Sequence, residues 1–176
     1  MRSLHPRLGE KLTEIERILD SHVDRAQRVG NAMANLADAT EVLDGLNYTF
    51  DSRQYGRGLV YGDPRGRFSI LALIWHPGHV TPLHAHQTWC AVTMLSGELT
   101  ETTYVYADRV PAGPQLVATR ALAPGDISCD AGDGNGIHRI QNASQALAIS
   151  LHVYGVPADR VDDGINIILA DERTRA

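Results

Sequence analysis

Apolar residues recur at helical spacing in the first part of the chain. A first set falls about one helical turn apart: Leu8, Leu12, Ile15 and Leu19. A second set follows Asp24 at the same spacing: Ala26, Val29, Met33 and Leu36. The pattern predicts two short amphipathic helices within about residues 1–45, and we expect their apolar faces to pack on the core.

The pattern changes from about residue 50 onward to short alternating or wholly apolar runs between glycines and prolines. These runs predict strands over residues 58–61, 68–75, 91–95, 101–106 and 146–154. Many short strands with turns between them indicate an all-β sandwich or barrel of the jelly-roll type. Residues 107–124 carry two prolines close together and predict a surface hairpin. We expect a single domain over residues 1–176, with the β-barrel spanning about 50–176.

Composition narrows the class of partner. The chain has 176 residues, of which 43% are hydrophobic, so it can bury a substantial core. With 16 basic and 21 acidic side chains it lacks the basic stripe that binds phosphates, which argues against a nucleic-acid partner. Two cysteines form no disulfide framework, and the sequence shows neither a signal peptide nor a membrane-length apolar run. We expect a cytoplasmic protein with a small-molecule partner and no membrane partner.

Three histidines indicate a metal site. His84 and His86 are separated by one residue, so on a strand both side chains project from the same face. His138 follows a glycine-rich turn and begins an alternating segment that can return the chain beside the first strand. Imidazoles without a carboxylate favour Fe, Zn, Cu or Ni over Ca or Mg. The sequence therefore predicts a mononuclear transition-metal site with open coordination positions.

Two segments resemble the motifs of the cupins. Residues 78–90 followed by Gly97 resemble the first cupin motif, with Cys90 in the position of the usual glutamate. Residues 124–126 and 138–142 resemble the second motif, although the glycine that precedes the histidine is displaced. The resemblance implies a cupin barrel with three metal ligands: His84, His86 and His138.

Cysteine in the acidic position and several further segments are similar to the thiol dioxygenases, the family of cysteine dioxygenase. Residues 55–60 resemble the segment whose arginine holds the substrate carboxylate, which assigns Tyr55 and Arg57 to substrate binding. Trp75 stands at the family's tryptophan position, and residues 150–154 resemble its Ser-x-His-x-Tyr run. The resemblance covers roughly residues 50–157 and implies four catalytic residues: Tyr154, His152, Ser150 and Cys90.

The chemistry of these residue types fits the implied roles. The planar guanidinium of Arg57 can hold a carboxylate through two parallel hydrogen bonds. Ser150, His152 and Tyr154 share one face of a strand, so a hydrogen-bond chain can orient the phenol toward the substrate. Family members with this cysteine can form a thioether to the tyrosine, so a Cys90–Tyr154 crosslink is a hypothesis here.

An Fe(II) ion held by neutral histidines alone keeps its full positive charge and favours an anionic thiolate. We therefore expect an iron-dependent dioxygenase of cysteine catabolism that uses O2 to oxidise a small carboxylate-bearing thiol, with L-cysteine as the leading substrate. One alternative is 3-mercaptopropionate or another mercapto acid. Gly155 replaces the usual serine after the tyrosine, and Arg160 offers a second carboxylate anchor. An alternative of another class is a non-redox cupin, either a ligand-binding module or an isomerase that uses Zn, Mn or Ni.

Overall fold

The computed structural model describes residues 4–21, 23–46, 54–106 and 113–169. Two helices come first, α1 (Pro6–Leu19) and α2 (Arg25–Ala34), followed by the short 3-10 helix η1 (Thr40–Leu43). The buried face of α1 comprises Leu8, Leu12, Ile15 and Ile18. Both predicted helices are confirmed, although Ile18 and not Leu19 closes the buried face of the first. Within the described ranges, no helix has the length and apolar character required to cross a bilayer.

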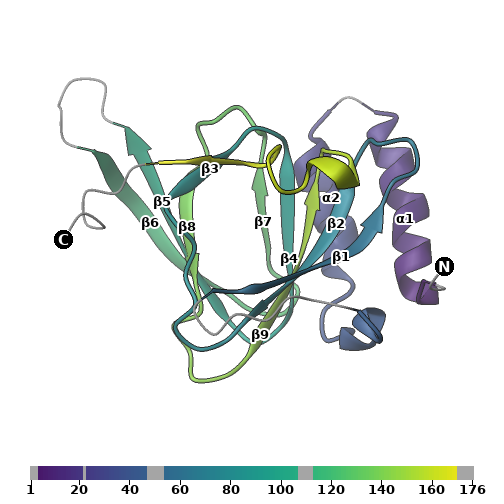
Figure 1. The fold of residues 1–176 in the computed structure, drawn as a ribbon, viewed down its shortest axis with the longest axis horizontal. Coiled ribbons are helices and arrows are strands. Elements are labelled where there is room, and N and C mark those ends of the chain that lie inside the picture. Colours follow the sequence, from purple (N-terminus) through teal and green to yellow (C-terminus); the bar gives the residue numbers. More distant parts are fainter. Residues whose placement is uncertain (1–3, 22, 47–53, 107–112, 170–176) are drawn as a thin grey trace.

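Within these ranges, ten strands form two antiparallel sheets (Figure 1). The first sheet has the order β1-β2-β9-β4-β7, and the second has the order β10-β3-β8-β5-β6. The strands are β1 (Gly56–Gly62), β2 (Ser69–Trp75), β3 (His84–His86), β4 (Cys90–Ser96), β5 (Leu99–Tyr106), β6 (Pro114–Leu122), β7 (Ile127–Asp130), β8 (Ile137–Gln141), β9 (Ala148–Tyr154) and β10 (Asn166–Ile168). The strands predicted from the alternating runs are confirmed. Residues 107–112 of the predicted hairpin lie outside the described residues, and β6 pairs with β5 as a hairpin requires.

Apolar side chains form two main clusters on opposite faces of the first sheet. The outer cluster packs the helices on the sheet and includes Leu8, Ile15, Met33, Phe68, Ile70 and Leu151. The inner cluster lies between the sheets and includes Leu73, Trp75, Val92, Met94 and Ile140. Because helices cover one face and the second sheet the other (Figure 1), every residue of β2 is buried. This explains why its sequence is continuously apolar and not alternating.

Strand register brings distant parts of the chain to one place inside the barrel. His84 on β3 lies opposite His138 on β8, so the predicted return of the chain beside the first histidine strand is confirmed. Asn166 on β10 lies opposite His86 on the other side of β3. In the first sheet, Cys90 on β4 lies opposite Tyr154 on β9. A candidate site therefore draws on strands of both sheets.

Candidate metal centre

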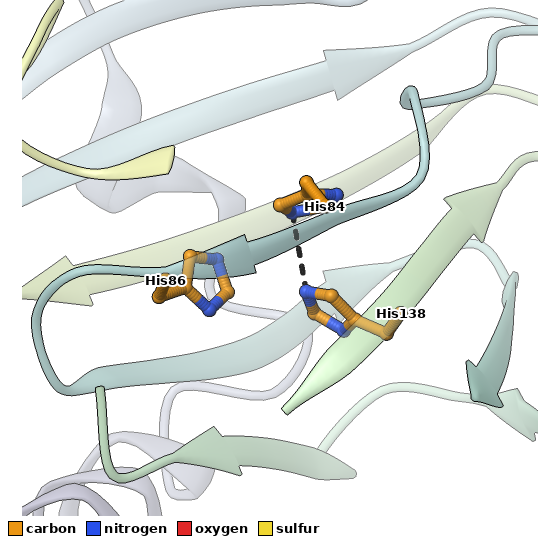
Figure 2. Close-up of side chains that lie close together, drawn as sticks. All are labelled: His84, His86 and His138. Carbon is orange, nitrogen blue, oxygen red and sulfur yellow. Dashed lines mark hydrogen bonds between the residues drawn. The ribbon is translucent and has the colours of Figure 1, made fainter. Parts of the chain in front are cut away.

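The three histidines converge inside the barrel (Figure 2). One ring nitrogen from each of His84, His86 and His138 lies within 4.8 Å of the others. All three residues are buried, with exposed fractions of 6%, 2% and 6%. The structure thus places the predicted ligands as a metal ion would require, with two from one face of β3 and one from its neighbour β8.

Each imidazole is oriented by a hydrogen bond at Nδ1. His84 Nδ1 lies 3.0 Å from the carbonyl oxygen of Pro82, which can only accept, so this nitrogen carries the proton. His86 Nδ1 lies 2.9 Å from a carboxylate oxygen of Asp130, and His138 Nδ1 lies 2.8 Å from one of Glu101. Both therefore donate through Nδ1 as well. In its neutral form, each of these imidazoles then has an unprotonated Nε2 as a ligand atom.

The distance between two of these nitrogens fits a shared ion. His84 Nε2 and His138 Nε2 are 3.1 Å apart (Figure 2). If both carry lone pairs, they repel one another unless a cation lies between them. Two nitrogens about 2.1 Å from one ion at near right angles would be separated by about 3.0 Å. Burial, reinforced by His138 and His86, lowers the pKa of His84 to about 3, so its imidazole is neutral and ready to ligate at neutral pH.

Two carboxylates, which the sequence analysis missed, lie behind the histidines on what we call the outer side of the trio. Glu101 is 2% exposed; burial alone would raise its pKa, but hydrogen bonds from His138, Ser128 and Arg120 lower it to about 2. For Asp130, burial is likewise outweighed by hydrogen bonds from His86 and the Gly132 amide, and its pKa is lowered. The predicted ligand trio therefore has two carboxylates as hydrogen-bond partners, which the pattern of imidazoles did not indicate. The signal for Glu101 was an acidic residue at an inward position of a strand.

On the opposite, inner side of the trio lies a chain of neutral hydrogen-bonding groups. Trp75 Nε1 donates to Ser150 Oγ at 2.9 Å, Ser150 Oγ lies 2.8 Å from His152 Nε2, and His152 Nδ1 lies 2.9 Å from Tyr154 Oη. An indole N–H can only donate, so Ser150 Oγ accepts from Trp75. The neutral imidazole of His152 donates through one ring nitrogen and accepts through the other, and with the proton on Nδ1 it donates to Tyr154 and leaves the phenol proton for the metal pocket. Sequence analysis identified three members of this chain and assigned Trp75 only a position.

Cys90 and Tyr154 face each other across neighbouring strands of the first sheet. Both are buried, with exposed fractions of 1% and 6%. Burial raises the pKa of the Cys90 thiol and of the Tyr154 hydroxyl well above their usual values, so both groups are protonated at neutral pH. Burial also lowers the pKa of His152 well below its usual value, which keeps its imidazole neutral as the hydrogen-bond chain requires.

The predicted substrate residues lie at different distances from the trio. Tyr55 lines a cavity of about 20 Å³ bounded by the three histidines and Tyr154, and its ring packs on Trp75 with centroids 4.5 Å apart. Arg57 does not line this cavity, because its guanidinium contacts Val161 O at 2.9 Å and Asp162 at 3.4 Å. Arg160 is half exposed and pairs with Asp163 at 2.8 Å. The structure thus gathers the metal ligands and Tyr55 around one cavity, and Arg57 lies outside the lining of that cavity.

Comparison with known proteins shows both the fold and the family. The structure resembles a cupin-2 domain from Rhodospirillum rubrum (TM-score 0.53, 16% identity, 73% of this chain and 78% of that one). It also resembles oxalate decarboxylase from Lactobacillus farciminis (TM-score 0.54, 16% identity, 76% of this chain and 37% of that one). These likenesses confirm the predicted cupin fold.

Relatives in sequence include cysteine dioxygenase type 1 of two species. Cysteine dioxygenase type 1 of Danio rerio is 27% identical over 153 residues, which cover 85% of this chain and 75% of that protein. The enzyme of Rattus norvegicus is 32% identical over 112 residues, 62% of this chain, and the match spans about half (55%) of that protein. The family profile of cysteine dioxygenase type I matches residues 4–163. With nearly the whole chain matched, the protein belongs to the cysteine dioxygenase type I family.

Proposed function

We propose that the protein is an iron-dependent thiol dioxygenase that oxidises a small carboxylate-bearing thiol, with L-cysteine the leading substrate, to its sulfinic acid. In this reaction the thiol sulfur is oxidised and both atoms of one O2 molecule end on it, so no further reductant is needed. The observation that carries the proposal is a trio of neutral histidine nitrogens that faces the Tyr154 end of an oriented hydrogen-bond chain. Family membership supports the same reaction.

His84, His86 and His138 would hold the ion. Bound Fe(II) would supply the electrons that activate dioxygen and a positive charge that favours the thiolate form of the substrate. With three ligands from the protein, the ion would keep coordination positions for substrate and dioxygen, and Tyr55 and Tyr154 line the cavity beside the trio. Buried apolar residues around that cavity, including Leu73, Val92 and Ile140, exclude water from it.

Tyr154 would act as a hydrogen-bond donor to the reacting groups. Its raised pKa keeps the phenol protonated, and His152 fixes the oxygen at 2.9 Å, so the phenol proton can turn to the pocket. A preorganised donor of this kind stabilises negative charge that develops on oxygen during the reaction.

Arg57 is the better of the two carboxylate anchors. The Arg57 guanidinium lies 3.4 Å from Asp162, whose side chain is 89% exposed. An exposed ion pair of this kind contributes little to stability, so a substrate can displace it at low cost. A substrate carboxylate can take the place of Asp162 and gain two parallel hydrogen bonds. Arg57→Ala should raise the KM for carboxylate thiols about 30-fold, equivalent to ~2 kcal/mol. The same change at Arg160 should leave KM unchanged, and a reversed result would assign the anchor to Arg160.

A thioether between Cys90 and Tyr154 is part of the proposal. The two residues are paired across β4 and β9 and buried together. Its formation would join Sγ to a ring carbon with loss of the thiol and ring hydrogens, and dioxygen would accept the two electrons. Intact-mass spectra after aerobic turnover should show a species lighter by two hydrogens that is absent from Cys90→Ser. An unchanged mass would reject the crosslink.

The deciding experiment measures oxygen consumption and products with a panel of thiols. Anaerobically purified protein is loaded with Fe(II), and L-cysteine, 3-mercaptopropionate, mercaptosuccinate and cysteamine are compared side by side. We expect the sulfinate of a carboxylate thiol, and cysteamine should be a poor substrate because it lacks the carboxylate. Preference for 3-mercaptopropionate would favour the mercapto-acid alternative. Stoichiometric zinc in the purified protein without oxygen uptake would favour a non-redox cupin.

A further inference from the structure

Glu101 on β5 is a buried carboxylate that accepts hydrogen bonds from three side chains. One oxygen, Oε1, lies 2.8 Å from His138 Nδ1 and 2.6 Å from Ser128 Oγ. The other, Oε2, accepts from Arg120 Nε at 2.8 Å. The side chain is 2% exposed, whereas that of Arg120 is 52% exposed.

These partners come from both sheets of the barrel. Arg120 is the register partner of Glu101 on β6, and His138 lies on β8 on the other side of β5. Ser128 lies on β7, at the edge of the opposite sheet. One carboxylate therefore joins the sheet that carries the metal ligands to the edge of the other sheet. This fixes the position of the oxygen that His138 contacts.

Stability alone does not account for a charge in this place. Burying a carboxylate is costly, and a buried ion pair contributes to stability no more reliably than apolar residues of the same volume. Arg120, half exposed to water, compensates only part of that cost. The contact with His138 Nδ1 offers another reason for the buried charge, because it acts directly on the imidazole of a metal ligand.

We propose that Glu101 is a positioning residue of the metal centre, which holds His138 as the Nδ1–H tautomer and places a negative charge behind the ion. Glu101 behind His138 and Asp130 behind His86 place two carboxylates next to the ligand trio. Neither carboxylate is one of the proposed ligands. The site should then bind a divalent ion more tightly than three isolated imidazoles would. The proposal rests on the proposed function only in that the trio binds a metal. It does not depend on the substrate or on the reaction with O2.

The first test compares ion affinities of variants that change charge with little change in shape. Glu101→Gln keeps an acceptor oxygen and removes the charge, so Fe(II) and Zn(II) affinities, measured by anaerobic chelator competition, should fall 10–100-fold. The matched control is Glu98→Gln, which removes an exposed carboxylate at the start of the same hairpin and should leave both affinities unchanged. Wild-type affinity in Glu101→Gln would overturn the proposal.

A second variant separates electrostatic positioning from a structural role. Arg120→Gln keeps the contact between Glu101 and His138 but removes the compensating positive charge. Ion affinity should then stay the same or rise a few-fold. If Glu101 served only to hold the strands together, both variants would weaken binding alike, and that result would overturn the proposal. Because Arg120 is half exposed, this arm remains decisive even where Glu101→Gln fails to fold.

A third measurement needs neither a variant nor an active enzyme. Long-range 1H–15N spectra of the metal-free wild type report the tautomer of each histidine. We expect the proton of His138 on Nδ1, and a proton on Nε2 would overturn the assignment. Protein that binds zinc but oxidises no thiol would refute the proposed function, while the zinc affinities and the tautomer would still decide the role of Glu101.

Discussion

On its inner side, the histidine trio faces neutral groups that pass hydrogen bonds toward the pocket, whereas on its outer side it contacts ionised carboxylates. The inner chain runs from Trp75 through Ser150 and His152 to Tyr154, and burial holds its titratable members in their neutral forms. The outer side contains Glu101, whose pKa is held at about 2. Full charges are thus placed where they act on the ligands and not where substrate and dioxygen react.

This difference explains how a site without acidic ligands can hold a divalent ion. Carboxylates that ligate directly would occupy open coordination positions and neutralise the attraction for a thiolate. Carboxylates one hydrogen bond farther out orient the imidazoles and would attract a bound ion without occupying its coordination positions. Under the proposed function, the two sides would make separable contributions, one to ion affinity and one to turnover.

The largest effect should come from a change in the histidine trio itself, which contacts both the inner and the outer side. His138→Ala removes a ligand and leaves Glu101 without its imidazole partner, so retention of iron and oxygen uptake with any thiol should be abolished. Metal analysis and circular dichroism of the same sample would show a folded, metal-poor protein. An active variant at near the wild-type rate would mean that the ligand set is wrong.

A change on the inner side should affect turnover and spare ion affinity. Tyr154→Phe keeps the ring and removes the donor, so kcat should fall on the order of 10²-fold, as for other preorganised donors. Chelator competition should give the wild-type affinity for Fe(II). Loss of affinity in this variant would break the distinction between the two sides.

The sequence predicted those parts of the site whose arrangement follows from residue spacing within a single strand. His84 and His86 share a face because strands have period two, and Ser150, His152 and Tyr154 share one for the same reason. The glycine-rich turn before His138 and the resemblance to the second cupin motif both indicated His138 as the third ligand, but spacing alone could not place it. The structure confirmed its position through the register of β3 and β8.

Glu101 and Asp130 escaped prediction because their roles depend on register between strands that are distant in sequence. Glu101 contacts His138 only because β5 pairs with β8, and Asp130 contacts His86 across the gap between the two sheets. An acidic residue within a strand is more often solvent-facing than buried, so the alternation of the strand gave only a weak signal for Glu101. Likewise, Trp75 joins the hydrogen-bond chain only because its partner Ser150 lies on another strand.

Acid should destabilise the metal-free protein in two steps that belong to different groups. Unfolding restores the pKa of His84 from about 3 to its ordinary value of 6.5, so between these values the unfolded state binds more protons. The free energy of unfolding should therefore fall as pH drops below 6.5. Glu101, with its pKa lowered from 4.5 to about 2, should add a further loss only below pH 4.5.

Urea unfolding of the metal-free protein at a series of pH values would separate the two steps. His84→Gln should flatten the dependence from pH 6.5 down to about 3, whereas Glu101→Gln should flatten it only below pH 4.5. Flattening above pH 4.5 by Glu101→Gln would contradict the assignment of the upper range to His84.

The smallest effect should come from the far end of the inner chain. Trp75→Phe keeps an aromatic ring against Tyr55 but removes the N–H that donates to Ser150 Oγ. With that bond lost, the Ser150 hydroxyl is held less firmly against His152, and kcat should fall about five-fold, equivalent to ~1 kcal/mol for one hydrogen bond. Trp89→Phe makes the same change beside the outer cluster and should leave kcat unchanged. Equal losses in both variants would show that the tryptophan acts through packing and not through this hydrogen bond.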